Sequence, residues 1–394
     1  MTKRITPGQI KMNNRQQIYN CIYRQRKVSQ QDILYALRLS RPTVAANLTA
    51  LEVDGMIRKV GQIEADQIGR KAAAYAIVPD YRVAIGVEIL RARFKIIAVD
   101  LYAEKLRREV VELRFAHEDG YYRQVCASIN GFIDALDIPR ERILGVGLSA
   151  QGLASRDGRS ISYGAILGCT GLTIDVFEAE LRLPCRFVHD PMGAVLSELW
   201  VSPELSDAVY ISLSSHLGGS VINGRRIMAG KHGHNATFEH IQARPRGEVC
   251  YCGQRGCWDT LLSRRALVGE ESVDAFFERV RAGDAAAVHR WNTYLKNLAQ
   301  MITALHLVND VDFILGGHLA PYFIETDIRR LYDEIRQQTQ FEEDDDFLRI
   351  SKMPSHNITV GVSLPYILAF LEESGVTFQE PSPYQAIETP AEAP

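Results

Sequence analysis

The chain has 394 residues, 46% of them hydrophobic and 24% charged, which is typical of a globular protein with two or three domains. No apolar run is long enough to cross a bilayer, and no signal-peptide core follows the charged first ten residues, so we expect a cytoplasmic protein without membrane contact. Residues 1–80 hold 13 Lys or Arg against 6 Asp or Glu, whereas the remainder holds 32 against 42. A basic module on an acidic body is typical of a protein that binds nucleic acid at one end.

The basic module predicts three helices followed by a β-hairpin. Ser29 and Asp32 resemble a capping box, and Ser40 is a good N-cap for a third helix. The helices are expected over 14–24, from Ser29 and from Ser40, and the strands over 57–61 and 72–78. This order predicts a winged helix-turn-helix over residues 1–80.

In a winged helix-turn-helix, the third helix enters the major groove of DNA with its N-terminus first. Arg suits guanine and Asn suits adenine, while basic residues on the wing meet phosphate or the minor groove. The predicted DNA-binding residues are Ser40, Arg41, Thr43, Asn47, Arg70 and Lys71. The alternative is a three-helix protein-interaction module with a solvated basic surface.

The acidic body alternates strands and helices in two similar cycles, which predicts an α/β pair of lobes with a ligand-binding cleft between them. Strands are expected at 83–90, 94–100, 106–113 and 143–148, and again at 208–213, 219–222, 226–228 and 313–315. We assign residues 81–190 to a first lobe, completed by a C-terminal helix over 359–375, and residues 191–358 to a second. Residues 376–394, rich in Pro and Glu, are expected to be a disordered tail.

Three of the seven cysteines lie within eight residues of the second lobe. Cys250, Cys252 and Cys257, with His240 upstream, have the types and spacing of a Cys₃His zinc set. Gly253 and Gly256 stand where a tight loop needs positive φ or a close backbone approach.

Two other readings of these cysteines are chance clustering of buried thiols and a disulfide. Without an oxidising compartment, clustered cysteines are better interpreted as metal ligands. Because three thiolates and an imidazole leave no open position, we expect a structural zinc ion.

The chain resembles the ROK family of bacterial sugar kinases and sugar-responsive repressors over nearly its whole length. The cysteine segment is the most specific match, because His240 and Cys250 have the family's separation and Cys-x-Cys-Gly-x-x-Gly-Cys follows. His189-Asp190 stands in place of the family's Asn-Asp. The resemblance implies an actin-like, ribonuclease-H-like body in two lobes, and the predicted winged helix implies the repressor branch.

The resemblance also implies where a kinase would hold nucleotide phosphates. The family's Asp-x-Gly-x-Thr reads Glu-Ile-Leu-Arg-Ala over 88–92, and its second Gly-rich segment reads Ser-Ser-His-Leu-Gly-Gly-Ser over 214–220. Phosphoryl transfer needs backbone amides, Mg²⁺ and a base around one phosphate. Both halves of that cradle have lost glycines, so we expect no enzyme activity.

The same resemblance implies the sugar-binding residues Asp190, Glu239, His240 and Asp259. Asp190 matches the kinases' general base, and His240 matches a histidine linked to both zinc and sugar. The family's Gly-Glu-x-Gly-His reads Ala-Thr-Phe-Glu-His over 236–240, so Thr237 replaces the sugar-binding Glu and Glu239 is the expected substitute. The alternatives are a helix N-cap for Asp190 and a first-turn carboxylate for Asp259.

These observations predict a homodimeric or homotetrameric repressor of carbohydrate genes that binds operator DNA through its head and a sugar or sugar derivative through its body. One alternative is a repressor with a degenerate pocket that a protein partner regulates. The other is an active sugar kinase. Activation in place of repression also stays open.

Overall fold

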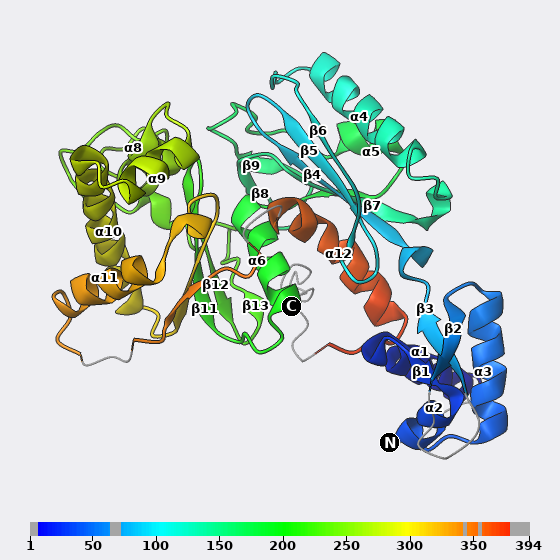
Figure 1. The fold of residues 1–394 in the computed structure, drawn as a ribbon. Coiled ribbons are helices and arrows are strands. Elements are labelled where there is room, and N and C mark those ends of the chain that lie inside the picture. Colours follow the sequence, from blue (N-terminus) through cyan, green and yellow to red (C-terminus); the bar gives the residue numbers. More distant parts are fainter. Residues whose placement is uncertain (1–6, 64–71, 342–344, 354–356, 379–394) are drawn as a thin grey trace.

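The computed structural model describes residues 7–63, 72–341, 345–353 and 357–378 (Figure 1). The N-terminal module holds α1 (Pro7–Gln25), β1 (Val28–Ser29), α2 (Gln30–Leu37), α3 (Arg41–Val53), β2 (Ile57–Ile63) and β3 (Ala72–Ile77). Its strands form an antiparallel sheet in the order β1-β3-β2. The predicted capping box is present, since Ser29 accepts from the Asp32 amide at 3.2 Å and Asp32 accepts from the Ser29 amide at 2.9 Å.

The first lobe is a five-stranded sheet in the order β10-β7-β4-β5-β6. Its elements are β4 (Val83–Ile89), β5 (Phe94–Val99), β6 (Lys105–Val111), α4 (Asp119–Asp134), β7 (Ile143–Ser149), β8 (Leu153–Ala154), β9 (Ile161–Tyr163), α5 (Asp175–Leu181) and β10 (Cys185–Phe187). The first three strands are antiparallel, whereas β7 and β10 run parallel to β4. Helices α4 and α5 pack side by side on one face (Figure 1).

The second lobe repeats this topology in the order β13-β12-β11-β14-β15. Its strands are β11 (Ala208–Leu213), β12 (Leu217–Asn223), β13 (Arg226–Ile227), β14 (Asp312–Gly316) and β15 (Leu348–Ile350). Its helices are α7 (Asp259–Leu262), α8 (Arg264–Val268), α9 (Val273–Arg281), α10 (Ala285–His306) and α11 (Glu325–Arg336). Because the first strand of each sheet is central and pairs antiparallel on one side and parallel on the other, the predicted pair of α/β lobes is confirmed.

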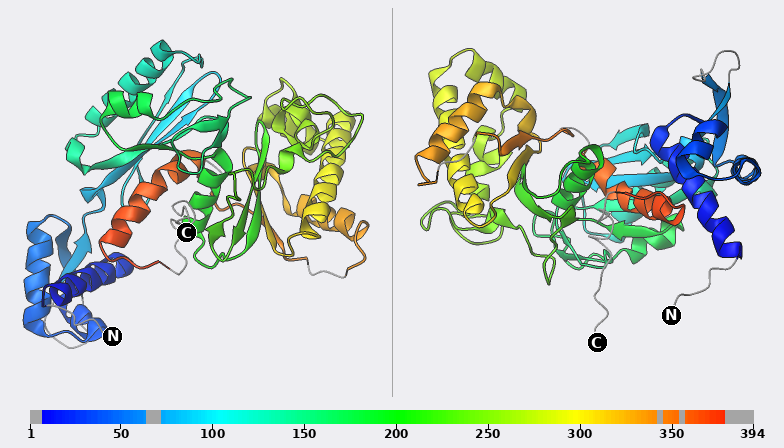
Figure 2. Two further views of the ribbon diagram at one scale, coloured as in Figure 1. Left: turned by 180° about the vertical axis from the view of Figure 1, so that it is seen from behind. Right: turned by 90° about the horizontal axis from the view of Figure 1, so that it is seen from below.

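Two helices, α6 (Asp190–Val201) and α12 (Asn357–Glu373), cross the middle of the molecule between the two sheets (Figures 1 and 2). They pack against each other and α12 also packs on β4 and β7. A Cβ added to Gly147 would lie 1.7 Å from the Val362 carbonyl oxygen, and one added to Gly361 would lie 1.7 Å from that of Gly193. Glycine therefore allows these backbones to touch.

The N-terminal module rests on the far end of α12. Gln16 Nε2 donates to the Glu373 carbonyl at 2.9 Å, and Tyr23 stacks on Tyr102 at 4.9 Å between ring centroids. One hydrophobic core runs continuously from α1 through α12 and α6 to the second sheet. None of the helices in the described ranges is long and apolar enough to cross a bilayer.

The prediction of a disordered tail over residues 376–394 is wrong for the first three of these residues. Val376 is buried, Thr377 accepts from Asn20 Nδ2 at 3.3 Å, and Phe378 packs at 6.1 Å from the Trp200 ring. These apolar and hydroxyl groups find partners on α1 and α6 that the local composition does not reveal. Residues 379–394 lie outside the described part of the chain.

Candidate functional site

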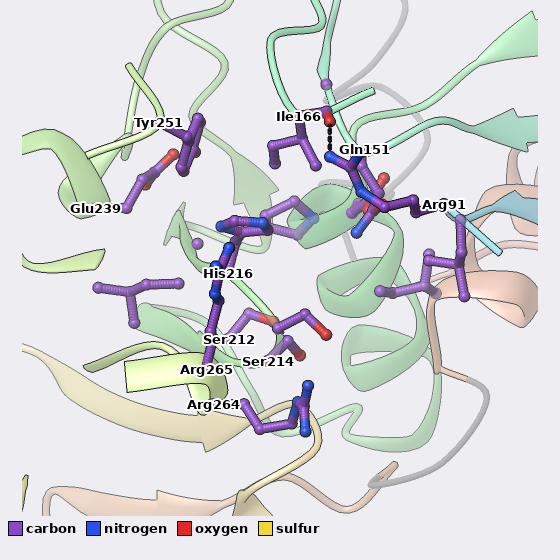
Figure 3. Close-up of a pocket in the computed structure, with 18 of the residues that line it drawn as sticks. Arg91, Gln151, Ile166, Ser212, Ser214, His216, Glu239, Tyr251, Arg264 and Arg265 are labelled. Carbon is purple, nitrogen blue, oxygen red and sulfur yellow. Dashed lines mark hydrogen bonds between the residues drawn. The ribbon is translucent and has the colours of Figure 1, made fainter. Parts of the chain in front are cut away.

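A cavity of about 700 Å³ lies between the two lobes. The first lobe supplies the turn after β4, the residues after β7 and the start of α6, whereas the second supplies the turn after β11, a short helical turn at Phe238–His240 and α8. Figure 3 shows Glu239 and Tyr251 toward one end of this cavity and Arg264 and Arg265 in another part of it. Ile358, in the first turn of α12, also lines it.

Asp190 is the first residue of α6 and faces the cavity. Its Oδ1 atom is buried and has no hydrogen-bond partner among the described residues. Burial, together with the nearby charge of Glu88, raises the pKa of Asp190 from 3.8 to about 7. The N-cap of α6 is His189, not Asp190, and no side chain caps this helix. The unpaired Oδ1 atom leaves Asp190 a free acceptor for a ligand hydroxyl group.

Glu88 and Lys95 form a buried ion pair beside Asp190. Lys95 Nζ lies 2.8 Å from Glu88 Oε2, and the two side chains are 13% and 4% exposed. Glu88 stands where the resemblance places the first aspartate of the phosphate cradle. Its carboxylate is therefore neutralised by a lysine from the neighbouring strand β5.

Glu239 points into the cavity from the short helical turn. Its Oε2 atom is buried without a partner in the described chain, and its Oε1 atom lies 4.0 Å from His240 Nε2. Burial raises the pKa of Glu239 to about 8. Ala236 keeps the positive φ of 63° that suits the family's glycine there, so the backbone turn survives the sequence change.

Asp259 is not among the residues that line the cavity. Its Oδ1 accepts the Leu217 amide at 2.8 Å, and its Oδ2 lies 3.4 Å from His216 Nδ1. It also begins α7, as the first-turn alternative proposed. The expectation that Asp259 faces the ligand is therefore wrong, because both carboxylate oxygens hold the turn after β11.

His240, Cys250, Cys252 and Cys257 form a tight cluster, with all four ligand atoms within 4.8 Å of one another. Cys250 Sγ lies 3.8 Å from His240 Nδ1, and Cys252 Sγ lies 3.8 Å from Cys257 Sγ. Two sulfurs held about 2.3 Å from one ion at a tetrahedral angle stand about 3.8 Å apart. The donor set and its spacing thus fit a tetrahedral metal site.

The two glycines of this segment have the conformations that the sequence predicts. Gly253 has φ 89° and Gly256 has φ 70°. A Cβ on Gly256 would lie 1.6 Å from the Arg244 carbonyl oxygen. The cluster can therefore close only with glycine at position 256.

In the N-terminal module, Ser40 caps α3 as predicted and Arg41 is exposed at its start, while Thr43 is half-buried. Asn47 is only 6% exposed and its Nδ2 donates to the Thr43 carbonyl at 2.8 Å. The expectation that Asn47 lies on the outer face is wrong, because it shares the inward stripe with Val44, Leu48 and Leu51. Arg70 and Lys71 lie outside the described residues.

The sequence does not predict several of the residues that line the cavity. Tyr251 lies between the two histidine rings, 4.7 Å from His216 and 5.0 Å from His240. Arg91, Arg264 and Arg265 bring guanidinium groups to the cavity from both lobes. Only Arg91, inside the altered phosphate segment, carries a signal in the sequence.

The model of the ROK family matches residues 84–361. The chain is 25% identical over 262 residues to the DNA-binding transcriptional dual regulator NagC of Escherichia coli K12, which covers 66% of this chain and 64% of that protein. It is 28% identical over 152 residues to the N-acetylmannosamine kinase of Yersinia pestis Pestoides F, covering 36% of this chain and 52% of the kinase.

Solved structures resemble the fold as well. A ROK family transcriptional regulator, described as a homolog of the E. coli MLC protein, aligns with a TM-score of 0.70 at 19% identity, over 93% of this chain and 98% of that one. A ROK family glucokinase from Streptomyces griseus aligns at 0.61 and 23% identity, over 71% and 98%. The family match over residues 84–361 and the repeated lobes lead to one conclusion: the chain belongs to the ROK family.

Proposed function

We propose that this chain is a cytoplasmic, DNA-binding repressor of carbohydrate genes whose ROK body senses a sugar or sugar derivative and does not transfer phosphate. The similarity to the regulator NagC and to the MLC-like regulator supports the proposal that this chain is a transcriptional repressor. The observation that carries the proposal is a physical link, since α12 begins at the ligand cavity with Ile358 and ends against α1 of the basic module at Glu373.

The N-terminal module supports DNA binding as a winged helix-turn-helix over residues 1–80. Helix α3 is N-capped by Ser40, carries Arg41 in its first turn, and exposes the small residues Ala45, Ala46 and Thr49. A helix with a small-residue outer face can lie deep in the major groove, where Arg41 would reach a base edge or phosphate. Ser40 and Thr43 would contact the sugar-phosphate backbone of the DNA, and Arg70 and Lys71 would contact it from the wing.

The altered phosphate cradle supports the loss of kinase activity. Glu88 is held by Lys95 at 2.8 Å, which leaves its carboxylate little capacity to position Mg²⁺. Arg91 and Ala92 present side chains where a nucleotide phosphate would need backbone amides.

The ligand end of the cavity supports sugar sensing. Asp190, Glu239 and His240 all line the cavity, and two of their carboxylate oxygens lack partners in the described chain. A hydroxyl-rich ligand would satisfy these atoms, whose unpaired burial otherwise costs roughly 1–3 kcal/mol each. We assign zinc to the Cys₃His cluster as a structural ion that fixes this segment through His240.

Ligand binding would then act on DNA through the two crossing helices. A ligand that favours one lobe angle would shift the head through α12, and in a homodimer or homotetramer it would change the spacing of two heads against operator half-sites.

The decisive experiment measures binding of the purified, zinc-loaded chain to duplex promoter fragments by fluorescence anisotropy at modest ionic strength. Arg41→Ala is expected to weaken binding roughly ten- to a hundredfold, because a guanidinium contact to DNA is lost. Arg329→Ala, an exposed arginine on α11, is the matched control and should leave the affinity unchanged. No binding to any fragment by the wild-type chain would refute the proposal.

A sugar kinase is the second candidate, favoured by Asp190, which keeps the position of the kinase base. ATP turnover with a panel of hexoses and amino sugars separates the two. Turnover that Asp190→Asn abolishes would establish the kinase, whereas absence of turnover in a chain that binds DNA supports the repressor.

A further inference from the structure

Four arginines bring positive charge to one part of the cavity. Arg91 and Arg93 reach it from the turn after β4, whereas Arg264 and Arg265 reach it from α8 in the second lobe. Figure 3 shows Arg91 separated from Arg264 and Arg265 across the cavity. Charged side chains from two lobes therefore face one common space.

None of these arginines has a buried carboxylate as its partner among the described residues. Arg91 donates to the Ile166 carbonyl, which leaves its charge uncompensated. Arg93 lies 3.7 Å from Glu112, whose side chain is 70% exposed. Among the described residues, no hydrogen bond or ion pair engages the guanidinium groups of Arg264 and Arg265.

The carboxylates that line the cavity do not offset this charge. Glu88 is already paired with Lys95, so these two cancel each other. Glu270 also lines the cavity, but it is exposed to solvent and forms no ion pair within the described ranges. Asp190 and Glu239 remain, and they are the groups that face ring hydroxyls in the proposed function.

We propose that the effector is an anionic sugar derivative, whose ring lies against Asp190, Glu239 and Tyr251 and whose phosphate or carboxylate group lies between Arg91 of the first lobe and Arg264 and Arg265 of the second. Guanidinium groups bind both anions through paired N–H donors. A cavity of about 700 Å³ has room for a ring and an anionic substituent, since ligand pockets span roughly 300–1,000 Å³.

This inference rests on the proposed function and adds a mechanism to it. An anion that contacts arginines of both lobes binds more tightly when the lobes are close together. This difference in ligand affinity between the open and closed arrangements is what a change in lobe angle requires. The family motif that the chain resembles has glycine in the first phosphate segment, whereas this chain has Arg91 within that segment. The site would therefore bind an anionic group without transferring a phosphoryl group.

The test is calorimetric titration of the zinc-loaded full chain at low ionic strength. The probes are neutral hexoses and N-acetylhexosamines, their phosphate monoesters, the corresponding hexuronates and inorganic phosphate. We expect one anionic class to bind at least tenfold more tightly than its neutral parent and than inorganic phosphate. The phosphate and carboxylate arms identify which anion the arginines prefer.

Variants locate the site. Arg264→Gln and Arg91→Gln should each weaken the anionic ligand roughly ten- to a hundredfold and leave a neutral parent sugar within threefold, because only the charged contact is lost. Arg329→Gln on α11 is the control and should bind like wild type.

Equal affinity for neutral and anionic sugars, binding of inorganic phosphate alone, no binding of either class, or wild-type anion affinity in both variants would overturn the inference. DNA binding is measured separately without ligand. Loss of DNA binding with intact anion binding refutes the repressor and leaves the anion site standing, whereas the reverse result refutes only the anion site.

Discussion

Asp190 and Trp200 lie at opposite ends of α6, and each touches a different functional region. Asp190 faces the cavity, whereas Trp200 Nε1, about 15 Å further along the helix, donates to the Tyr102 carbonyl at 3.2 Å. Tyr102 in turn donates to the Tyr23 carbonyl in α1 at 3.3 Å and carries Arg26 over its ring. Helix α6 therefore runs beside α12 from the cavity to the base of the N-terminal module.

The docking of the module depends on Gly375, just after α12. Its φ is 86°, and a Cβ there would lie 2.2 Å from Gln16 Cβ in α1. Gly283 after α9 has φ 79° with open space around it. Both Gly→Ala changes should cost about 1 kcal/mol of unfolding free energy through backbone strain, but only Gly375→Ala should displace α1.

Hydrogen exchange of α1 measures this displacement. We expect faster exchange in Gly375→Ala than in Gly283→Ala, together with a smaller effect of ligand on DNA affinity. Identical α1 exchange in the two variants would show that the α12 end does not hold the module.

Asp190 should destabilise the fold at neutral and alkaline pH. Burial raises its pKa from 3.8 to about 7, so the unfolded chain releases this proton at lower pH than the folded chain does. Stability therefore falls as pH rises from about 4 to about 7, and the full cost, on the order of 4 kcal/mol at most, applies above pH 7. Glu88 from β4 and Lys95 from β5 are the charged groups that face it, with opposite effects.

Asp190→Asn removes this ionisation. Urea unfolding should find the variant more stable than wild type by roughly 1–4 kcal/mol at pH 8.5, and by about half as much at pH 5.5. Asp134→Asn, at an exposed carboxylate on α4, is the control and should show no such trend. A pH-independent difference between Asp190→Asn and wild type would contradict the raised pKa.

Much of the fold follows from local sequence signals. The capping box at Ser29, the alternating strands and the cysteine spacing each depend on residues close in sequence, and the structure contains all of them. The packing of Val376 on the module depends on chain segments some 350 residues apart, and no local pattern encodes such contacts.

The residues of the candidate site also divide into those that a local sequence pattern predicts and those that depend on distant segments. The metal cluster lies in one segment of 18 residues, so its spacing predicts it. Asp259 was expected to face the ligand because of the family resemblance, but its carboxylate accepts the Leu217 amide, which belongs to strand β12. The basic part of the cavity combines the turn after β4 in the first lobe with α8 in the second, so neither segment alone reveals it.

The metal cluster should hold one ion that stabilises the second lobe. Cys257→Ser is expected to remove about one equivalent of zinc and to lower the melting temperature by on the order of 5–10 °C, because three remaining ligands bind the ion weakly. Cys126 is an equally buried thiol in α4 outside the metal cluster, and the control variant Cys126→Ser should retain its zinc. Metal analysis and thermal melts compare the two, and unchanged zinc content in Cys257→Ser would rule out the assigned ligand set.

The outer face of α3 can be separated from its buried face by two substitutions. Asn47→Ala should lower stability by about 1 kcal/mol, because its bond to the Thr43 carbonyl is lost, while changing DNA sequence preference little. Ala45→Glu should leave stability nearly unchanged, since Ala45 is exposed, yet weaken DNA binding more than tenfold by placing a carboxylate near phosphates. Ala286→Glu, at an exposed alanine of α10, is the matched control. If Asn47→Ala alters sequence preference while Ala45→Glu binds DNA normally, then α3 does not present this face to the groove.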